Sequence, residues 1–168
     1  MNLGLKDCKA FIAGASKGPG KACAKALADE GARVFICARN KQALKQAASE
    51  FGAAGYSAAD VSLLAKVKRV VAEAITALGG LDCLVTNAGG PPTAPFERAS
   101  DEDWDSAYKV NLMSAVRLIR EALPGTEVLR PGAHRQPDWL RRKRTPDRSC
   151  SLGFGSRRRH GDGQNYCD

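Results

Sequence analysis

The stretch "GASKGPG" (Gly14–Gly20) joins a short apolar run, Lys9–Gly14, to an alanine-rich segment, Gly20–Gly31, that has the composition of a helix. Its glycines have the spacing G-x-x-x-G-x-G, and glycine permits a tight turn whose backbone can approach a ligand closely. The backbone N–H groups and the dipole at the start of a helix attract phosphate. The stretch therefore predicts a dinucleotide-binding turn, made by Gly14, Ser16, Lys17, Gly18, Pro19 and Gly20. The alternative is a glycine turn that only packs the helix on the strand.

On both sides of this turn, strand-like and helix-like segments alternate through residues 1–123. Such alternation predicts βαβ units, and with them a parallel sheet, right-handed crossovers and an α/β fold. The expected strands are Lys9–Gly14, Arg33–Arg39, Gly55–Val61 and a strand within Leu81–Gly90 that runs into a turn. The expected helices are Gly20–Gly31, Lys41–Gly52, Ser62–Gly80 with Ser62 as its N-cap, and Ser100–Gly125, which Pro-Gly should end.

The second expected strand ends in a positive charge. Sites that prefer NAD usually place an acidic side chain there, where it binds the ribose hydroxyls. In this chain Arg39 occupies the position, and Lys17 adds a second cation in the glycine turn. Two cations suit a 2′-phosphate, so we expect NADP rather than NAD. Two solvated surface charges would produce the same pattern.

Polar or small residues also follow the third and fourth expected strands. Asp60 and Val61 come after the third, where the carboxylate could contact an adenine edge or simply precede a helix N-terminus. Asn87, Ala88 and Gly89 follow the fourth, at the end of the sheet where α/β proteins bind ligands. Their small size leaves room for a cofactor, although a plain turn would also explain them.

Asn111 falls inside an apolar stripe of the last expected helix. The stripe has helical spacing and consists of Trp104, Ala107, Tyr108, Leu112, Ala115, Leu118, Ile119 and Ala122. Burial of the stripe would bury Asn111, and a buried amide that lacks a hydrogen bond costs about 1–3 kcal/mol. Asn111 is therefore either a satisfied structural residue or a site residue that orients a water or a carbonyl.

In this order the motifs resemble the short-chain dehydrogenase/reductase family over about residues 5–123. Gly14, Gly18 and Gly20 match its glycine pattern, Asp60 its adenine-contacting aspartate, Asn87-Ala88-Gly89 its Asn-Ala-Gly, and Asn111 its catalytic helix asparagine. Two mild departures are Ala13 for threonine and Pro19 for a branched apolar residue. The Gly-Pro-Pro that follows Asn-Ala-Gly is similar to an atypical subgroup, the 3-oxoacyl carrier-protein reductase-like proteins.

This resemblance implies a partial Rossmann fold with about four strands in the order 3-2-1-4, NAD(P) binding, and hydride transfer to or from an unidentified carbonyl or alcohol. The family's chemistry also needs a serine and a Tyr-x-x-x-Lys, in which lysine lowers the pKa of the tyrosine. Neither Tyr56 nor Tyr108 has lysine four residues later, and Tyr166 lies too near the end. The resemblance therefore implies a truncated and inactive member, or a catalytically dead NADP-binding module. Homo-oligomers are usual in the family, but its interface helices are only partly present here.

Residues 125–168 differ from residues 1–124, which form the expected dinucleotide-binding part. After residue 123 the chain has ten Lys and Arg against five Asp and Glu, within a total net charge of +8. Proline, glycine, arginine and serine without periodicity are typical of disorder. Degenerate codons for Gly132–Leu140, read one base forward, permit "GRIVNLTG", which looks like the family's fifth strand. Those for Arg157–Asp168 permit "AAVTGMAKTIA". We therefore hypothesise a one-base frameshift near Leu123–Thr126.

The alternative for the basic region is a nucleic-acid-binding arm, in which Arg141–Arg144 and Arg157–Arg159 would neutralise phosphates. Aromatic residues do not interleave with these runs, so we expect no nucleic-acid partner.

The six cysteines form no C-x-x-C, and only two histidines are present, so we expect no metal site. No run reaches the length of a membrane span and no signal peptide is evident, so we expect a cytoplasmic protein.

Overall fold

Four parallel strands form one sheet in the computed structural model, which describes residues 3–90 and 95–127. The strands are β1 (Lys9–Ala13), β2 (Arg33–Ala38), β3 (Gly55–Ala58) and β4 (Cys83–Val85). Their order is β3-β2-β1-β4, with Phe11 of β1 opposite Phe35 of β2 and Leu84 of β4. The predicted parallel sheet and its strand order are confirmed.

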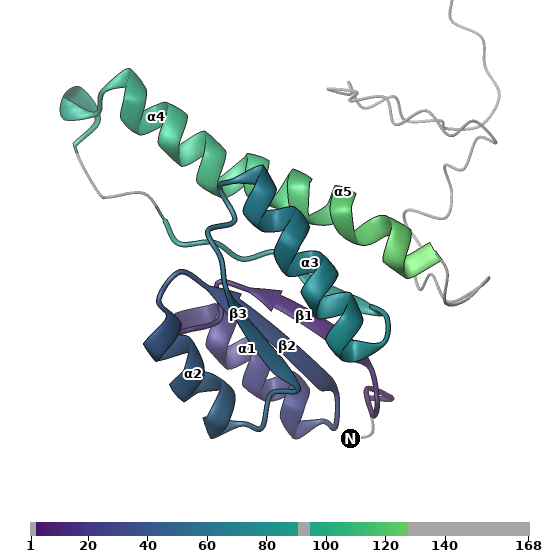
Figure 1. Ribbon diagram of the computed structural model, residues 1–168. Helices are drawn as coiled ribbons and strands as arrows, with labels where there is room; N and C mark the ends of the chain where they lie inside the picture. The colour runs from purple at the N-terminus through teal and green to yellow at the C-terminus, as the bar shows by residue number, and fades with distance from the viewer. Residues whose placement is uncertain (1–2, 91–94, 128–168) are drawn as a thin grey trace, which may run out of the picture. The chain divides into compact units, whose positions relative to one another are not determined.

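Helices cover both faces of this sheet (Figure 1). The helices α1 (Gly18–Asp29) and α2 (Lys41–Glu50) pack on one face, where Ile12, Ile36 and Leu44 are buried together. The helices α3 (Leu64–Leu78) and α5 (Ser114–Glu127) pack on the other face. Because β1 and β2 are buried on both sides, they carry near-continuous apolar runs rather than alternating ones.

The first part of the predicted helix Ser100–Gly125 is divided into two elements. A 3-10 turn, η1 (Phe96–Arg98), precedes α4 (Asp101–Tyr108), and the π-helical turn η2 (Lys109–Met113) joins α4 to α5. Ser100 caps α4 in a capping box with Asp103, because each side chain bonds the other residue's backbone N–H. The helical path is therefore continuous but not uniformly α-helical.

Two boundary predictions were wrong. Pro124 does not end the last helix, which continues to Glu127. A proline removes its own N–H bond and crowds the carbonyl four residues earlier, and α5 continues for less than one turn beyond it. Ser62 is not the N-cap of α3, because Leu63 holds that position with no side-chain cap, and the Ser62 N–H instead bonds the Asp60 carboxylate. Both errors arise at helix ends, where the bounds of an element are least determined by periodicity.

The expected burial of the apolar stripe was also wrong for its first half. Leu118 and Ala122 are buried against α3, whereas Trp104, Tyr108 and Leu112 are each more than half exposed. The reason is geometric: α5 lies over α3, whereas in the described part of the chain the outer faces of α4 and η2 have few neighbours beyond the Phe96 ring, which meets Trp104 edge-on. Asn111 is accordingly exposed.

The described cysteines, Cys8, Cys23, Cys37 and Cys83, are free thiols. Cys37 is fully buried in β2, and this burial raises its pKa to about 12. It therefore behaves as a small apolar core residue. No helix within the described ranges combines the length and apolar character required to cross a membrane.

The attachment of α5 should depend on Leu118. Leu118 is 1% exposed within the core cluster, so Leu118→Ala should lower the free energy of unfolding by about 2–5 kcal/mol. The adjacent Ile119 is 47% exposed, and Ile119→Ala should change it by no more than about 1 kcal/mol. Urea unfolding of both variants measures the difference, and equal losses would contradict this packing.

Candidate functional site

A cleft of about 560 Å³ opens at the carboxyl ends of the four strands. This volume lies within the range of small-molecule sites, and the position is the one at which open parallel sheets bind ligands. Its walls come from the segments after all four strands and from η2: Gly14, Ser16, Lys17, Gly18, Pro19, Ala38, Arg39, Asn40, Ala43, Ala59, Asp60, Val61, Asn87, Ala88, Gly89, Gly90 and Val110. The structure thus brings together the residues that the sequence singled out after each strand.

The glycine turn packs so closely on the β4 end that two of its positions have no room for a side chain. Gly14 has φ of +63°, and a Cβ on it would lie 2.6 Å from Asn87 Nδ2. A Cβ on Gly20 would lie 2.5 Å from the Gly14 carbonyl oxygen. Gly20 is buried beneath the turn and does not line the cleft, so in this structure it contributes close packing, and its predicted contact with a cofactor stays a prediction.

Asn87 fastens the ends of two neighbouring strands together. Its Nδ2 donates to the Gly14 carbonyl at 3.1 Å and, more weakly, to the Ala13 carbonyl at 3.4 Å. Both carbonyls lie where the chain turns at the end of β1. The Asn87 side-chain amide therefore holds the glycine turn against the segment after β4. The sequence predicted Asn87 at the cleft but not this bond, which joins residues far apart in the chain.

The N-terminus of α1 faces the cleft without a protein cap. Lys17 stands at the N-cap with extended backbone, makes no capping side-chain bond, and is followed by Pro19 in the first turn. The first turn holds no acidic residue, so its N–H groups and the helix dipole remain available for an anion. The cationic Lys17 side chain is exposed at the same end.

Arg39 projects from the end of β2 across the cleft. A Cβ built on Gly89 would lie 3.4 Å from Arg39 Nη2, which places the guanidinium beside the backbone that follows β4. The next residue, Asn40, caps α2 by accepting a bond from the Ala43 N–H at 3.0 Å. Asn40 and Ala43 also line the cleft, and the sequence analysis missed both. The Asn-x-x-Ala start of α2 was the signal that could have indicated them.

Asp60 forms the far side of the cleft in a local turn. Its Oδ1 accepts from the Ser62 N–H at 2.9 Å, and its carbonyl accepts from the Leu63 N–H at 3.2 Å. Partial burial raises the pKa of Asp60, but bonds from the Ser62 hydroxyl and N–H and the charge of Arg39 outweigh it, so the pKa is lowered overall. The carboxylate is therefore ionised at neutral pH.

The predicted residue Asn111 does not line the cleft in this structure. It lies exposed in η2, whereas its neighbour Val110 reaches the wall. The Val110 carbonyl accepts a bond from the Ser114 hydroxyl across the π-turn. Because Asn111 is exposed, its amide can bond water and needs no buried partner. The catalytic role of Asn111 stays a prediction.

Comparison with known proteins agrees with this geometry. The family model for short chain dehydrogenases matches residues 9–132. An uncharacterized oxidoreductase of Bacillus subtilis, YvrD, is 35% identical over 127 residues, which cover 74% of this chain and 48% of that protein. The chain spans about half the length of the curated relatives that it matches.

Two solved structures are similar. L-sorbose reductase from Gluconobacter frateurii, complexed with NADPH and L-sorbose, superposes with a TM-score of 0.71 at 34% identity over 76% of this chain and 51% of that one. A variant of actinorhodin polyketide ketoreductase with NADPH gives 0.66 at 29% identity, over 74% of this chain and 49% of that one.

Gly20→Ala should damage the glycine turn although alanine favours a helix. The new Cβ would meet backbone rather than a movable side chain, so we expect a loss of about 1–3 kcal/mol in unfolding free energy. Gly90→Ala is the matched control, because a Cβ there meets nothing within 4 Å. Urea denaturation compares the two, and a Gly20→Ala chain as stable as the parent would show that the turn is not packed this closely.

Proposed function

The chain belongs to the short-chain dehydrogenase family of oxidoreductases, and from that premise we propose that its cleft binds NADP(H). The observation that carries the proposal is the uncapped start of α1, where Lys17, Gly18 and Pro19 line the cleft directly after the tightly packed glycine turn. Such a cradle fits a pyrophosphate, which accepts backbone N–H bonds and is attracted by a helix N-terminus. The cleft of about 560 Å³ lies within the size range of small-molecule sites.

The charged residues around the cleft support NADP over NAD. Arg39 follows β2, where a 2′-phosphate would lie, and Lys17 stands on the glycine side of the cleft. A guanidinium recognises phosphate with paired donors, and no acidic side chain occupies the position after β2 to repel it. Asp60 would accept a bond from the adenine amino group, because an ionised carboxylate has more lone pairs than its bonds from Ser62 use.

We propose that the cofactor binds without turnover. When bound, NADPH supplies a hydride for transfer to a carbonyl carbon. Such a reduction needs a nearby acid to protonate the carbonyl oxygen. Tyr56 in β3 and Tyr108 in α4 are exposed and do not line the cleft, and Tyr166 lies outside the described residues. The chain holds no Tyr-x-x-x-Lys, so the residues that it does contain supply binding rather than proton transfer.

Arg39→Ala should reduce the preference for NADPH. We expect the parent chain to bind NADPH tighter than NADH, and Arg39→Ala to weaken NADPH binding about tenfold while NADH binding changes little. Arg120→Ala on α5, an exposed arginine for which the structure shows no side-chain bond, is the control. Titration calorimetry gives the affinities. Equal weakening for both cofactors would remove the 2′-phosphate assignment, and oxidation of NADPH with any small carbonyl would refute the proposal of an inactive site.

We also propose that a one-base frameshift lies before residue 133. The residues before it then form the dinucleotide-binding part, and the basic residues after it are not family sequence. The supporting observation is that the family model matches as far as residue 132. That end lies beyond Leu123–Thr126, so we place the shift between Thr126 and Gly132. All residues from 128 onward lie outside the described part of the chain.

Sequencing of the coding DNA tests the frame. We expect the forward-shifted frame after Thr126 to read close to "GRIVNLTG" and, further on, "AAVTGMAKTIA", and to stay open beyond the present end. A closed or unrelated shifted frame would contradict the frameshift. The basic segment would then be a real feature of this protein, and salt-dependent nucleic-acid binding that is lost on deletion of residues 126–168 would identify it as a binding arm.

A further inference from the structure

Two arginines from different helices hold the loop that carries Asp60. The loop leaves β3 at Ser57 and Ala58 and enters α3 after Ser62. Arg69 on α3 binds its beginning, and Arg117 on α5 binds its end. Neither arginine lines the cleft, so any effect on a ligand must pass through the loop.

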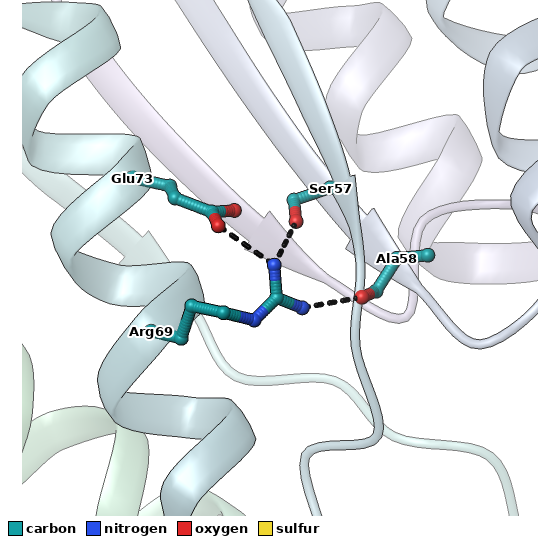
Figure 2. A network of polar contacts seen from close by, with 4 residues as sticks. All are labelled: Ser57, Ala58, Arg69 and Glu73. Carbon is teal, nitrogen blue, oxygen red and sulfur yellow. Dashed lines mark hydrogen bonds and ion pairs between the residues drawn. The ribbon is translucent and has the colours of Figure 1, made fainter.

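The contacts of Arg69 fix the direction in which the chain leaves β3 (Figure 2). Its Nη2 donates to the Ala58 carbonyl at 2.7 Å, and its Nη1 donates to Ser57 Oγ at 3.2 Å. Glu73, one turn further along α3, accepts from the same Nη1 at 2.7 Å and orients the guanidinium. The planar fork of arginine suits this arrangement, because it can serve several acceptors in one plane.

Arg117 acts on the other end of the loop. Its Nη1 donates to the Ser62 carbonyl, and Ser62 in turn donates its N–H to Asp60 Oδ1. The residue next to Arg117, Leu118, is buried in the core, which fixes the rotation of α5 and thus the side from which Arg117 leaves the helix. The chain of contacts therefore runs from α5 through Ser62 to the carboxylate.

We propose that Arg117 and Arg69 are positioning residues for adenine recognition: they hold the Ser57–Ser62 loop so that Asp60 presents a fixed carboxylate to the cleft. This inference rests on the proposed dinucleotide function. Asp60 lies in a loop, and an aspartate in a turn has several conformations of similar energy unless neighbouring groups select one. Loops carry binding residues when a rigid scaffold places them, and here α3 and α5 are that scaffold.

The first experiment separates the adenine end from the nicotinamide end. Full-length Arg117→Met is titrated with NADPH, with adenosine 2′,5′-bisphosphate and with reduced nicotinamide mononucleotide. We expect about fivefold weaker binding of the two adenine-containing ligands, as for the loss of one hydrogen bond, and no change for the mononucleotide. Arg120→Met, one turn further along α5, is the control and should bind all three as the parent does. Unchanged adenine binding in Arg117→Met would overturn the proposal.

The second experiment distinguishes positioning from general support of the fold. In an Asp60→Asn background, Arg117→Met should add no further loss of affinity, because the carboxylate that it positions is already gone. A fully additive loss would assign Arg117 a merely structural role. Arg117→Lys should recover part of the affinity, since lysine keeps one donor, and it replaces Arg117→Met if that variant fails to fold. Arg69→Met should also weaken binding of the adenine-containing ligands, and it should add no further loss in the Asp60→Asn background. Lys68→Met is its control and should bind as the parent does.

The third measurement does not need a ligand. The Asp60 carboxyl can be titrated by NMR, and loosening of the Ser62 N–H bond in Arg117→Met should raise its pKa toward the ordinary aspartate value. An unchanged Asp60 pKa would overturn the positioning role. If the parent chain does not bind NADPH, the proposed function fails, whereas this titration still decides whether Arg117 holds Asp60.

Discussion

The close approach of Asn87 to the glycine turn is the contact on which the rest of the site depends. A cleft at the end of a parallel sheet needs its wall segments at fixed separations, and the Nδ2 bond to the Gly14 carbonyl sets the separation between the ends of β1 and β4. That bond is possible only because Gly14 and Gly20 have no Cβ to occupy the same space. The uncapped start of α1, the Arg39 guanidinium and the Asp60 turn then surround a cleft whose base is already fixed.

In the described part of the chain, one edge of the sheet and one helix face are left uncovered. Among the described residues, β4 has a strand partner only in β1, and the outer faces of α4 and η2 present Trp104, Tyr108 and Leu112 to solvent. An apolar strand at a sheet edge and an apolar helix face both invite association. The cleft does not depend on that face, because its walls follow β1, β2, β3 and β4 and only Val110 comes from the helical segment.

Much of this arrangement could be predicted from the sequence, because local signals determine it. Glycine spacing after an apolar run indicated the turn, the buried run Arg33–Arg39 indicated β2, and alternating strands and helices indicated the parallel sheet. Contacts between distant residues could not be predicted in this way. Three features depend on how the helices pack on the sheet: the bond from Asn87 to Gly14, the contact from Arg117 to Ser62 and the exposure of Asn111. Periodicity placed Asn111 on an apolar stripe, but it did not show that only the part of the stripe that faces α3, with Leu118 and Ala122, is buried.

Amide hydrogen exchange, measured on the full-length chain with and without NADPH, tests the central claim most directly because it locates the ligand on the backbone. If the glycine turn and the start of α1 cradle the pyrophosphate, the amides of residues 14–18 and of Gly20 should exchange more slowly with NADPH, and so should those of residues 87–90. The amides of the outer face of α4 should not change. Slower exchange confined to other segments, or no change at saturating NADPH, would contradict a dinucleotide site in this cleft.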